Sequence, residues 1–239
     1  MTSSLHRYGR HRSQVAELTL PDAPGPHRVV VLAHGGCWRP RYDRHLMDDL
    51  AVDLGGRGWA AWNIEYRRVG PRAGGGWPAT FEDVAAAIDH LADLDAPLDL
   101  AGVAAVGHSA GGHLVLWAAG REGARVPLSA VVGQAAISDL DRAAAEGVCG
   151  GMVEQLLDGP PDRVPDRYRE ASPARRLPLD VPALLVHGGR DDVVPAAMSR
   201  RFAAAAGCEL AEIPDDGHYE HLEPGSRAWA SVVAWLERL

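Results

Sequence analysis

The chain contains 239 residues, of which 46% are hydrophobic and 23% are charged, so it can bury a sizeable core and does not have the composition of a disordered protein. Its formal net charge of -8 and the absence of a basic stripe argue against a nucleic-acid partner. Residues 1–14 hold no apolar export segment, and no apolar run approaches the roughly 18 residues of a membrane span. We expect a cytoplasmic protein of one domain, residues 1–239, without a membrane partner.

The first half of the chain alternates between strand and helix patterns. Residues 1–12 are polar and are expected to fray, whereas residues 14–20 alternate as a short edge strand. A β-branched run at residues 28–33 is typical of a strand buried on both faces. The next elements expected are a helix, a strand and a second helix, at residues 43–57, 59–64 and 78–94.

The second half continues the alternation with one interruption. A strand at residues 102–107, a helix at 110–120 and a strand at 129–136 are followed by short polar and Pro-rich segments, which predict an insertion or small cap at about 138–180. The last elements expected are a strand, a helix, a strand and a helix, at residues 183–187, 195–207, 209–213 and 226–239. This order predicts an α/β fold with an open, mostly parallel sheet and helices on both faces.

The three cysteines are Cys37, Cys149 and Cys208. They are odd in number and far apart, so neither a disulfide framework nor the spacing of a zinc site is indicated. A reducing compartment fits this cysteine usage best.

Residues 107–111 read Gly-His-Ser-Ala-Gly and join the strand at 102–107 to the helix at 110–120. A serine in such a turn sits on a sharp reversal from strand to helix, which the flanking glycines permit because they lack a Cβ. The hydroxyl of Ser109 would then point out of the sheet toward a substrate. Alone, the pentapeptide fits an ordinary Gly-rich turn equally well, so residues elsewhere in the chain must decide between a structural turn and a catalytic serine.

A serine hydroxyl attacks a carbonyl only with the help of a base and an orienting carboxylate. Side chains converge beyond the carboxyl ends of parallel strands, and two late loops in such positions hold acids and histidines. The first loop offers Asp191 or Asp192, and the second offers His218 or His221. The chain order serine, acid, histidine is that of the nucleophile-elbow class and predicts a Ser-His-Asp triad with Ser109 as the nucleophile.

The negative oxygen formed during acyl transfer needs positioned N–H donors. One is expected from Ala110, the residue after the nucleophile. Gly36 and Cys37 are expected to supply others, because two glycines follow the strand at 28–33 and let backbone amides point into the site. The same loop must face the site, so Trp38 is expected to line the acyl pocket. This chemistry needs no cofactor and no metal.

Several polar residues near these loops are interpreted as structural. His34 and His108 flank the two turns and are expected to form hydrogen bonds rather than to act as bases. Glu65 follows an apolar strand and is expected to take part in a buried or half-buried ion pair. The histidine of the last loop that is not the base is expected to face solvent, and the aspartate that is not in the triad to cap a helix.

Over nearly its whole length the chain resembles the serine hydrolases of the α/β-hydrolase fold. His34-Gly35-Gly36-Cys37-Trp38 matches the His-Gly-Gly-x-Trp motif of the kynurenine formamidase-like esterases and their bacterial carboxylesterase relatives, and residues 107–114 are similar to their nucleophile segment. Residues 187–191 match a His-Gly-x-x-Asp pattern in which the acid stands four after the histidine, which favours Asp191. The resemblance likewise favours His218 over His221.

The resemblance implies an α/β-hydrolase fold with a small cap and a carboxylesterase-type serine hydrolase that cleaves a small ester or amide through an acyl-enzyme intermediate. Because formamidases share the motif, an arylformamidase acting on N-formylkynurenine is the first alternative. A non-catalytic α/β-hydrolase-fold binding protein is the second, although the intact serine, acid and histidine argue against it. The expected partner is a small-molecule ester or amide, and the sequence leaves the oligomeric state open.

Overall fold

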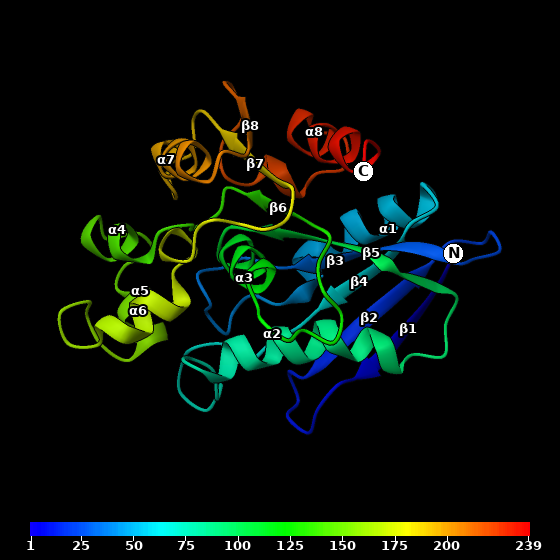
Figure 1. The fold of residues 1–239 in the computed structure, drawn as a ribbon, viewed down its shortest axis with the longest axis horizontal. Helices are drawn as coiled ribbons and strands as arrows, with labels where there is room; N and C mark the ends of the chain where they lie inside the picture. Colours follow the sequence, from blue (N-terminus) through cyan, green and yellow to red (C-terminus); the bar gives the residue numbers. More distant parts are fainter.

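A computed structural model describes all residues, 1–239, and contains one eight-stranded sheet with the order β1-β2-β4-β3-β5-β6-β7-β8 (Figure 1). β2 pairs antiparallel with both of its neighbours, and every other pair is parallel. The strands are β1 (Thr2–Arg7), β2 (Val15–Leu20), β3 (His27–Ala33), β4 (Ala60–Ile64), β5 (Leu98–His108), β6 (Ala130–Gln134), β7 (Ala183–Gly188) and β8 (Glu209–Ile213). The predicted mostly parallel sheet is confirmed.

The N-terminal segment differs from the prediction. Residues expected to fray form β1, which pairs along its whole length with β2, from Thr2 opposite Leu20 to Arg7 opposite Val15. β1 is therefore the edge strand and β2 is not. Almost every side chain of β1 is exposed, so no apolar alternation marks the strand, and backbone hydrogen bonds to β2 order it instead.

Helices cover both faces of the sheet because successive side chains of each central strand point to opposite sides. In β3, Val29 and Val31 belong to one apolar cluster, whereas Val30 and Leu32 belong to another. α1 (Asp48–Gly56) and α8 (Arg227–Leu236) pack on the side of Val30, and α2 (Ala79–Asp89), α3 (Ala110–Ala119) and α7 (Ala196–Ala206) pack on the side of Val29. None of the helices combines the length and apolarity needed to cross a bilayer.

Two predicted helices are each divided in the structure. The helix expected at residues 43–57 begins with the 3-10 turn η1 (Arg44–Met47) and continues as α1, and the helix expected at residues 78–94 consists of α2 and the turn η2 (His90–Asp93).

The expected insertion, residues 138–180, lies between β6 and β7 and is called the cap here. It consists of α4 (Leu140–Ala145), α5 (Met152–Leu157), α6 (Pro165–Ala171) and the turn η3 (Pro173–Arg175), gathered at one end of the molecule (Figure 1). Met152, Leu156 and Tyr168 are buried and join the larger apolar cluster. The cap therefore packs on the body, and its helices are too short to show a clear period in the sequence.

Replacement of Trp229 by alanine tests the packing of α8. The Trp229 side chain is fully buried on the face of Val30 and donates its indole N–H to Asp53 of α1 at 2.7 Å. Trp229→Ala should lower the free energy of unfolding by about 3–5 kcal/mol, because a large cavity is left. Urea denaturation measures the loss.

Val52→Ala is the matched control, because Val52 lies next to Asp53 on α1 but is 54% exposed, and this substitution should change the free energy of unfolding by about 0.5 kcal/mol or less. Equal effects of the two substitutions would contradict the assigned core.

Candidate active site

The turn from β5 to α3 carries Ser109. Its φ of 55° and ψ of -115° are unusual for a residue with a side chain. The turn brings backbone segments so close together that neither flanking glycine has room for a side chain. A Cβ on Gly107 would lie 2.2 Å from the carbonyl oxygen of Gly111, and a Cβ on Gly111 would lie 2.0 Å from that of Ala33. Glycine is therefore required at both positions, and the buried Ser109 hydroxyl has no hydrogen-bond partner within the protein.

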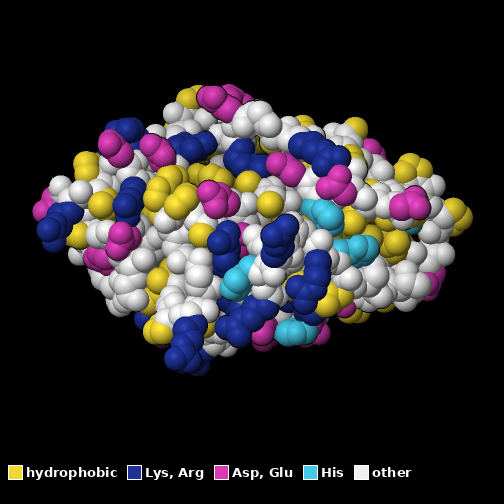
Figure 2. All heavy atoms as spheres, turned by 90° about the horizontal axis from the view of Figure 1, so that it is seen from below, with side chains coloured by type: hydrophobic (Ala, Val, Ile, Leu, Met, Phe, Trp, Pro, Cys, Tyr) yellow, Lys and Arg dark blue, Asp and Glu magenta, His cyan; other side chains and the backbone are white.

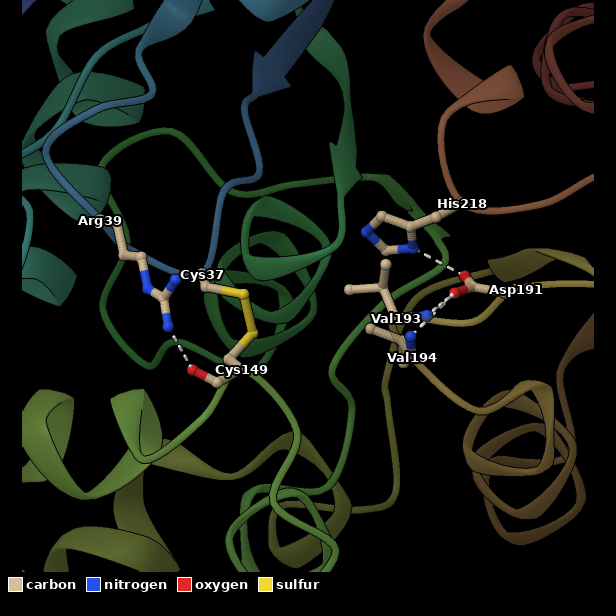
Figure 3. The surroundings of a disulfide bond; sticks show 7 residues. All are labelled: Cys37, Arg39, Cys149, Asp191, Val193, Val194 and His218. Carbon is tan, nitrogen blue, oxygen red and sulfur yellow. Dashed lines mark hydrogen bonds and ion pairs between the residues drawn. A yellow bond between two sulfur atoms is a disulfide. The ribbon is translucent and has the colours of Figure 1, made fainter.

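Asp191 and His218 lie in contact beyond the ends of β7 and β8. The Nδ1 of His218 donates to a carboxylate oxygen of Asp191 at 2.7 Å, and the other carboxylate oxygen accepts the N–H groups of Val193 and Val194, each at 2.8 Å (Figure 3). Burial raises the pKa of Asp191, but hydrogen bonds from His187 and His218 outweigh it and hold the pKa well below its usual range. Asp191 is thus an ionised partner for the imidazole.

Asp192 and His221, the alternatives left open by their loops, differ from the expectations for the residues outside the triad. Asp192 is exposed and does not cap α7, which begins after Pro195 without a side-chain cap. His221 was expected to face solvent, and this is wrong: it is fully buried, because the turn η4 (Glu220–Leu222) directs it inward. Burial, with the neighbouring His187 and His218, lowers the pKa of His221 to about 3.

His108 has the structural role expected of it. Its Nε2 donates a hydrogen bond to the backbone carbonyl of His218 at 2.8 Å, and the centroids of the two imidazole rings lie 4.7 Å apart. Burial, together with the charges of His218 and His221, lowers the pKa of His108 well below its ordinary value. A neutral His108 therefore fixes the backbone that carries His218.

One cavity of about 280 Å³ brings the separate loops together. Its lining includes Ser109, His218, Gly36 and Cys37, and Asp191 lies on the far side of His218. The lining residues are Gly36, Cys37, Arg39, Tyr42, Leu46, His108, Ser109, Cys149, Val193, His218, Tyr219 and Leu222. The cavity is thus mostly apolar, with one serine, two histidines and one arginine on its wall.

The loop after β3 contains three consecutive residues with positive φ: Gly36 at 101°, Cys37 at 51° and Trp38 at 54°. The first must be glycine, because a Cβ there would lie 2.4 Å from the ring of Tyr42. Trp38 was expected to line the cavity, but it does not. The loop turns its side chain into the core, where it is fully buried and meets the ring of His113 edge-on at 5.3 Å.

Cys37 and Cys149 form a disulfide across 112 residues of sequence, and Cys208 is free (Figure 3). The expectation of no disulfide is therefore wrong. Spacing gave no signal for the pair, because Cys149 lies in the cap, whose sequence pattern is the least regular of the chain. With two of the three cysteines joined, the cysteine usage no longer favours a reducing compartment.

Comparison with known proteins identifies the family. The BD-FAE sequence profile matches residues 17–205, which is most of the chain. The chain belongs to the BD-FAE family. The esterase LipC of Mycobacterium tuberculosis (strain ATCC 25618 / H37Rv) is 30% identical over 259 aligned positions that include 95% of this chain. The chain spans only 62% of the length of LipC.

Solved structures agree with the fold of this BD-FAE chain. A truncated carbohydrate esterase from gut microbiota matches 100% of the chain and 96% of its own with a TM-score of 0.85 and 21% identity. The thermophilic esterase Est2 of Thermogutta terrifontis matches 99% of the chain and 90% of its own with a TM-score of 0.78 and 20% identity. Together with the sheet order, these likenesses confirm the α/β-hydrolase fold.

In this BD-FAE chain, a buried carboxylate stabilises the loop residues that come just before Gly36. Its oxygens accept hydrogen bonds: the Glu65 carboxylate lies 3.0 Å from Nε2 of His34, 3.0 Å from the guanidinium of Arg68 and 2.9 Å from the backbone nitrogen of Tyr66. The His34 ring also stacks on Tyr66 with centroids 4.3 Å apart. The predicted ion pair of Glu65 and the hydrogen-bonding role of His34 are both confirmed.

Replacement of Glu65 by glutamine tests this brace. Burial raises the pKa of Glu65, but His34, Arg68 and the Tyr66 N–H outweigh it, so the pKa is lowered in the folded protein. A lowered carboxyl pKa contributes stability above the unfolded value, about 4.3, and the contribution is lost as pH falls. Glu65→Gln should therefore cost about 3 kcal/mol near pH 7 and progressively less toward pH 3.

Urea denaturation across this pH range measures the difference, with the exposed Glu223→Gln as the control. A Glu65→Gln deficit that stays constant from pH 7 to pH 3 would contradict the assigned charge.

Proposed function

We propose that this chain is a carboxylesterase-type serine hydrolase that cleaves a small ester through an acyl-enzyme intermediate. The observation that carries the proposal is the pairing of His218 with Asp191 at 2.7 Å beside an unpartnered Ser109 hydroxyl in the same cavity. The name of the relative LipC supports ester hydrolysis as the reaction.

The proposed route has two matched halves. Ser109 Oγ bonds to the acyl carbon while its proton moves to Nε2 of His218, the ring nitrogen not held by Asp191. His218 then gives this proton to the leaving alcohol, and the acyl group stays on Ser109. In the second half, water bonds to the acyl carbon while His218 takes its proton. The bond from this carbon to Ser109 Oγ then breaks, His218 returns the proton to Oγ, and the acid is released. Asp191 fixes the imidazole tautomer and stabilises its positive charge, so the route needs no cofactor.

The backbone N–H groups of Ala110, Gly36 and Cys37 are proposed to hold the oxyanion. Ala110 is the first residue of α3, where backbone N–H groups have no partner inside the helix and favour negative charge. Gly36 and Cys37 line the cavity from the opposite loop. Loss of one such donor typically costs about 2.7–4 kcal/mol of transition-state stabilisation.

The size and lining of the cavity bear on the substrate. A volume of about 280 Å³ is at the small end of ligand sites, which supports a short acyl group. The rings of Tyr42 and Tyr219 in the lining favour one second candidate, an arylformamidase acting on N-formylkynurenine. Turnover of acetate esters and of N-formylkynurenine by the same preparation separates the two.

Replacement of the proposed nucleophile tests the mechanism. Ser109→Ala should lower kcat for p-nitrophenyl acetate by at least about 10⁴-fold, because the residual rate comes only from binding and the oxyanion donors. The thermal unfolding midpoint should stay near that of the wild type. A fluorophosphonate should label the wild type and not the variant.

Ser138→Ala is the matched control, because Ser138 is also fully buried with an unpartnered hydroxyl but does not line the cavity. Turnover retained in folded Ser109→Ala would rule out this mechanism. Absence of fluorophosphonate labelling in the wild type would favour the non-catalytic binding protein.

A further inference from the structure

The loop at residues 36–39, called the oxyanion loop here, holds an unfavourable conformation. Cys37 and Trp38 have positive φ although each carries a Cβ, and they follow Gly36, whose φ is also positive. Such a run persists only where the surroundings over-determine it. On the side of the body, the N–H of Arg39 donates to the Gly36 carbonyl at 2.9 Å and that of Val69 to the Trp38 carbonyl at 2.8 Å.

On its other side the oxyanion loop is joined to the cap. Cys37 is covalently bonded to Cys149, and the guanidinium of Arg39 donates to the Cys149 carbonyl at 2.8 Å (Figure 3). Cys149 lies in a turn that also has positive φ, at 63°, and the same is true of Gly150 at 59° and Gly151 at 77°. Two tightly turned segments from different parts of the chain therefore face each other.

Cys149 is the single cap residue among those that line the cavity. The cap thus reaches the site through the residue that is bonded to Cys37. Both cysteines are only partly buried, and both line the cavity, so a small reductant can reach the sulfur pair. Cys208, which is free, does not line the cavity and provides an internal control.

We propose that the Cys37–Cys149 disulfide is a positioning link that holds the oxyanion loop in its active shape, so that full catalytic activity requires the oxidised protein. This inference rests on the proposed function, because Gly36 and Cys37 are its oxyanion donors. A cross-link removes conformations that the loop could otherwise adopt. Without the disulfide, only the backbone hydrogen bonds on the other side of the loop keep residues 36–38 at positive φ, and the loop relaxes.

Relaxation of the loop acts on the transition state more than on substrate binding. The oxyanion forms only during the reaction, so displaced N–H donors lower kcat and leave KM nearly unchanged. The redox step is a thiol–disulfide exchange in which a dithiol such as dithiothreitol passes two electrons and two protons to the sulfur pair. The protein gains two thiols, and the dithiol becomes a disulfide.

The experiment compares oxidised wild type, wild type reduced with dithiothreitol, and Cys149→Ser, which cannot form the link. Steady-state hydrolysis of p-nitrophenyl acetate should show kcat at least tenfold lower for the last two, with KM changed less than about threefold. Backbone hydrogen exchange should become faster at residues 36–39 and 147–151 and remain unchanged in β3 and β5. After removal of dithiothreitol, oxidised glutathione should accept the two electrons and two protons of the thiol pair, re-form the disulfide and restore kcat.

Cys208→Ser is the control and should behave like wild type, including the loss of kcat on reduction. Unchanged kcat and unchanged loop exchange after verified reduction would overturn the proposal. Faster exchange spread over the whole sheet would also overturn it, because the disulfide would then stabilise the fold in general.

Hydrogen exchange separates this inference from the proposed function. If the oxidised protein hydrolyses no ester, the proposed function fails, and the disulfide loses its catalytic role while exchange still reports whether it orders the loop. If Cys149→Ser does not fold, reduction of the folded wild type still decides the outcome.

Discussion

The close approach of α3 to β3 and β5 is the constraint on which the site depends. In the first turn of α3, Gly111 lies against the carbonyl of Ala33 so closely that even a methyl group would come to 2.0 Å. This contact fixes where the helix begins and therefore fixes the turn that carries Ser109. Because β3 and β5 are neighbours in the sheet, it also places Ser109 beside the oxyanion loop.

The parallel sheet brings the remaining groups to the same edge. β3, β5, β7 and β8 run in one direction, and the loops beyond their carboxyl ends carry Gly36, Ser109, Asp191 and His218. Electrostatics then separates the roles of the histidines and acids. Burial keeps His108 neutral, whereas several donors keep Asp191 ionised beside His218. The arrangement gives one imidazole a carboxylate partner and leaves the other as a brace.

The sequence predicts the body of the fold well because its signals are local. The β-branched run of β3, the short apolar run of β7 and the contact of Gly107 with Gly111 are short-range features, and the serine, acid and histidine occur in the chain order of the nucleophile-elbow class. β1 escaped prediction because its exposed side chains show no alternation. The short cap helices escaped for a similar reason, since six or seven residues cover fewer than two turns.

The errors near the site arise from contacts between distant segments. The Cys37–Cys149 bond joins residues 112 positions apart, so no local pattern announces it. Trp38 and His221 are buried by the direction of a single turn each, a choice set by backbone angles that composition does not encode. Such residues need the folded chain before their roles can be assigned.

A crystal structure of the protein with a covalently bound phosphonate tests the convergence of these loops most directly. The phosphorus should be attached to Oγ of Ser109, and Nε2 of His218 should lie within hydrogen-bond distance of that oxygen. The phosphonyl oxygen should lie about 2.7–3.1 Å from the backbone nitrogens of Ala110 and of Gly36 or Cys37. A phosphonate attached to another residue, or a phosphonyl oxygen directed away from these amides, would contradict the proposed site.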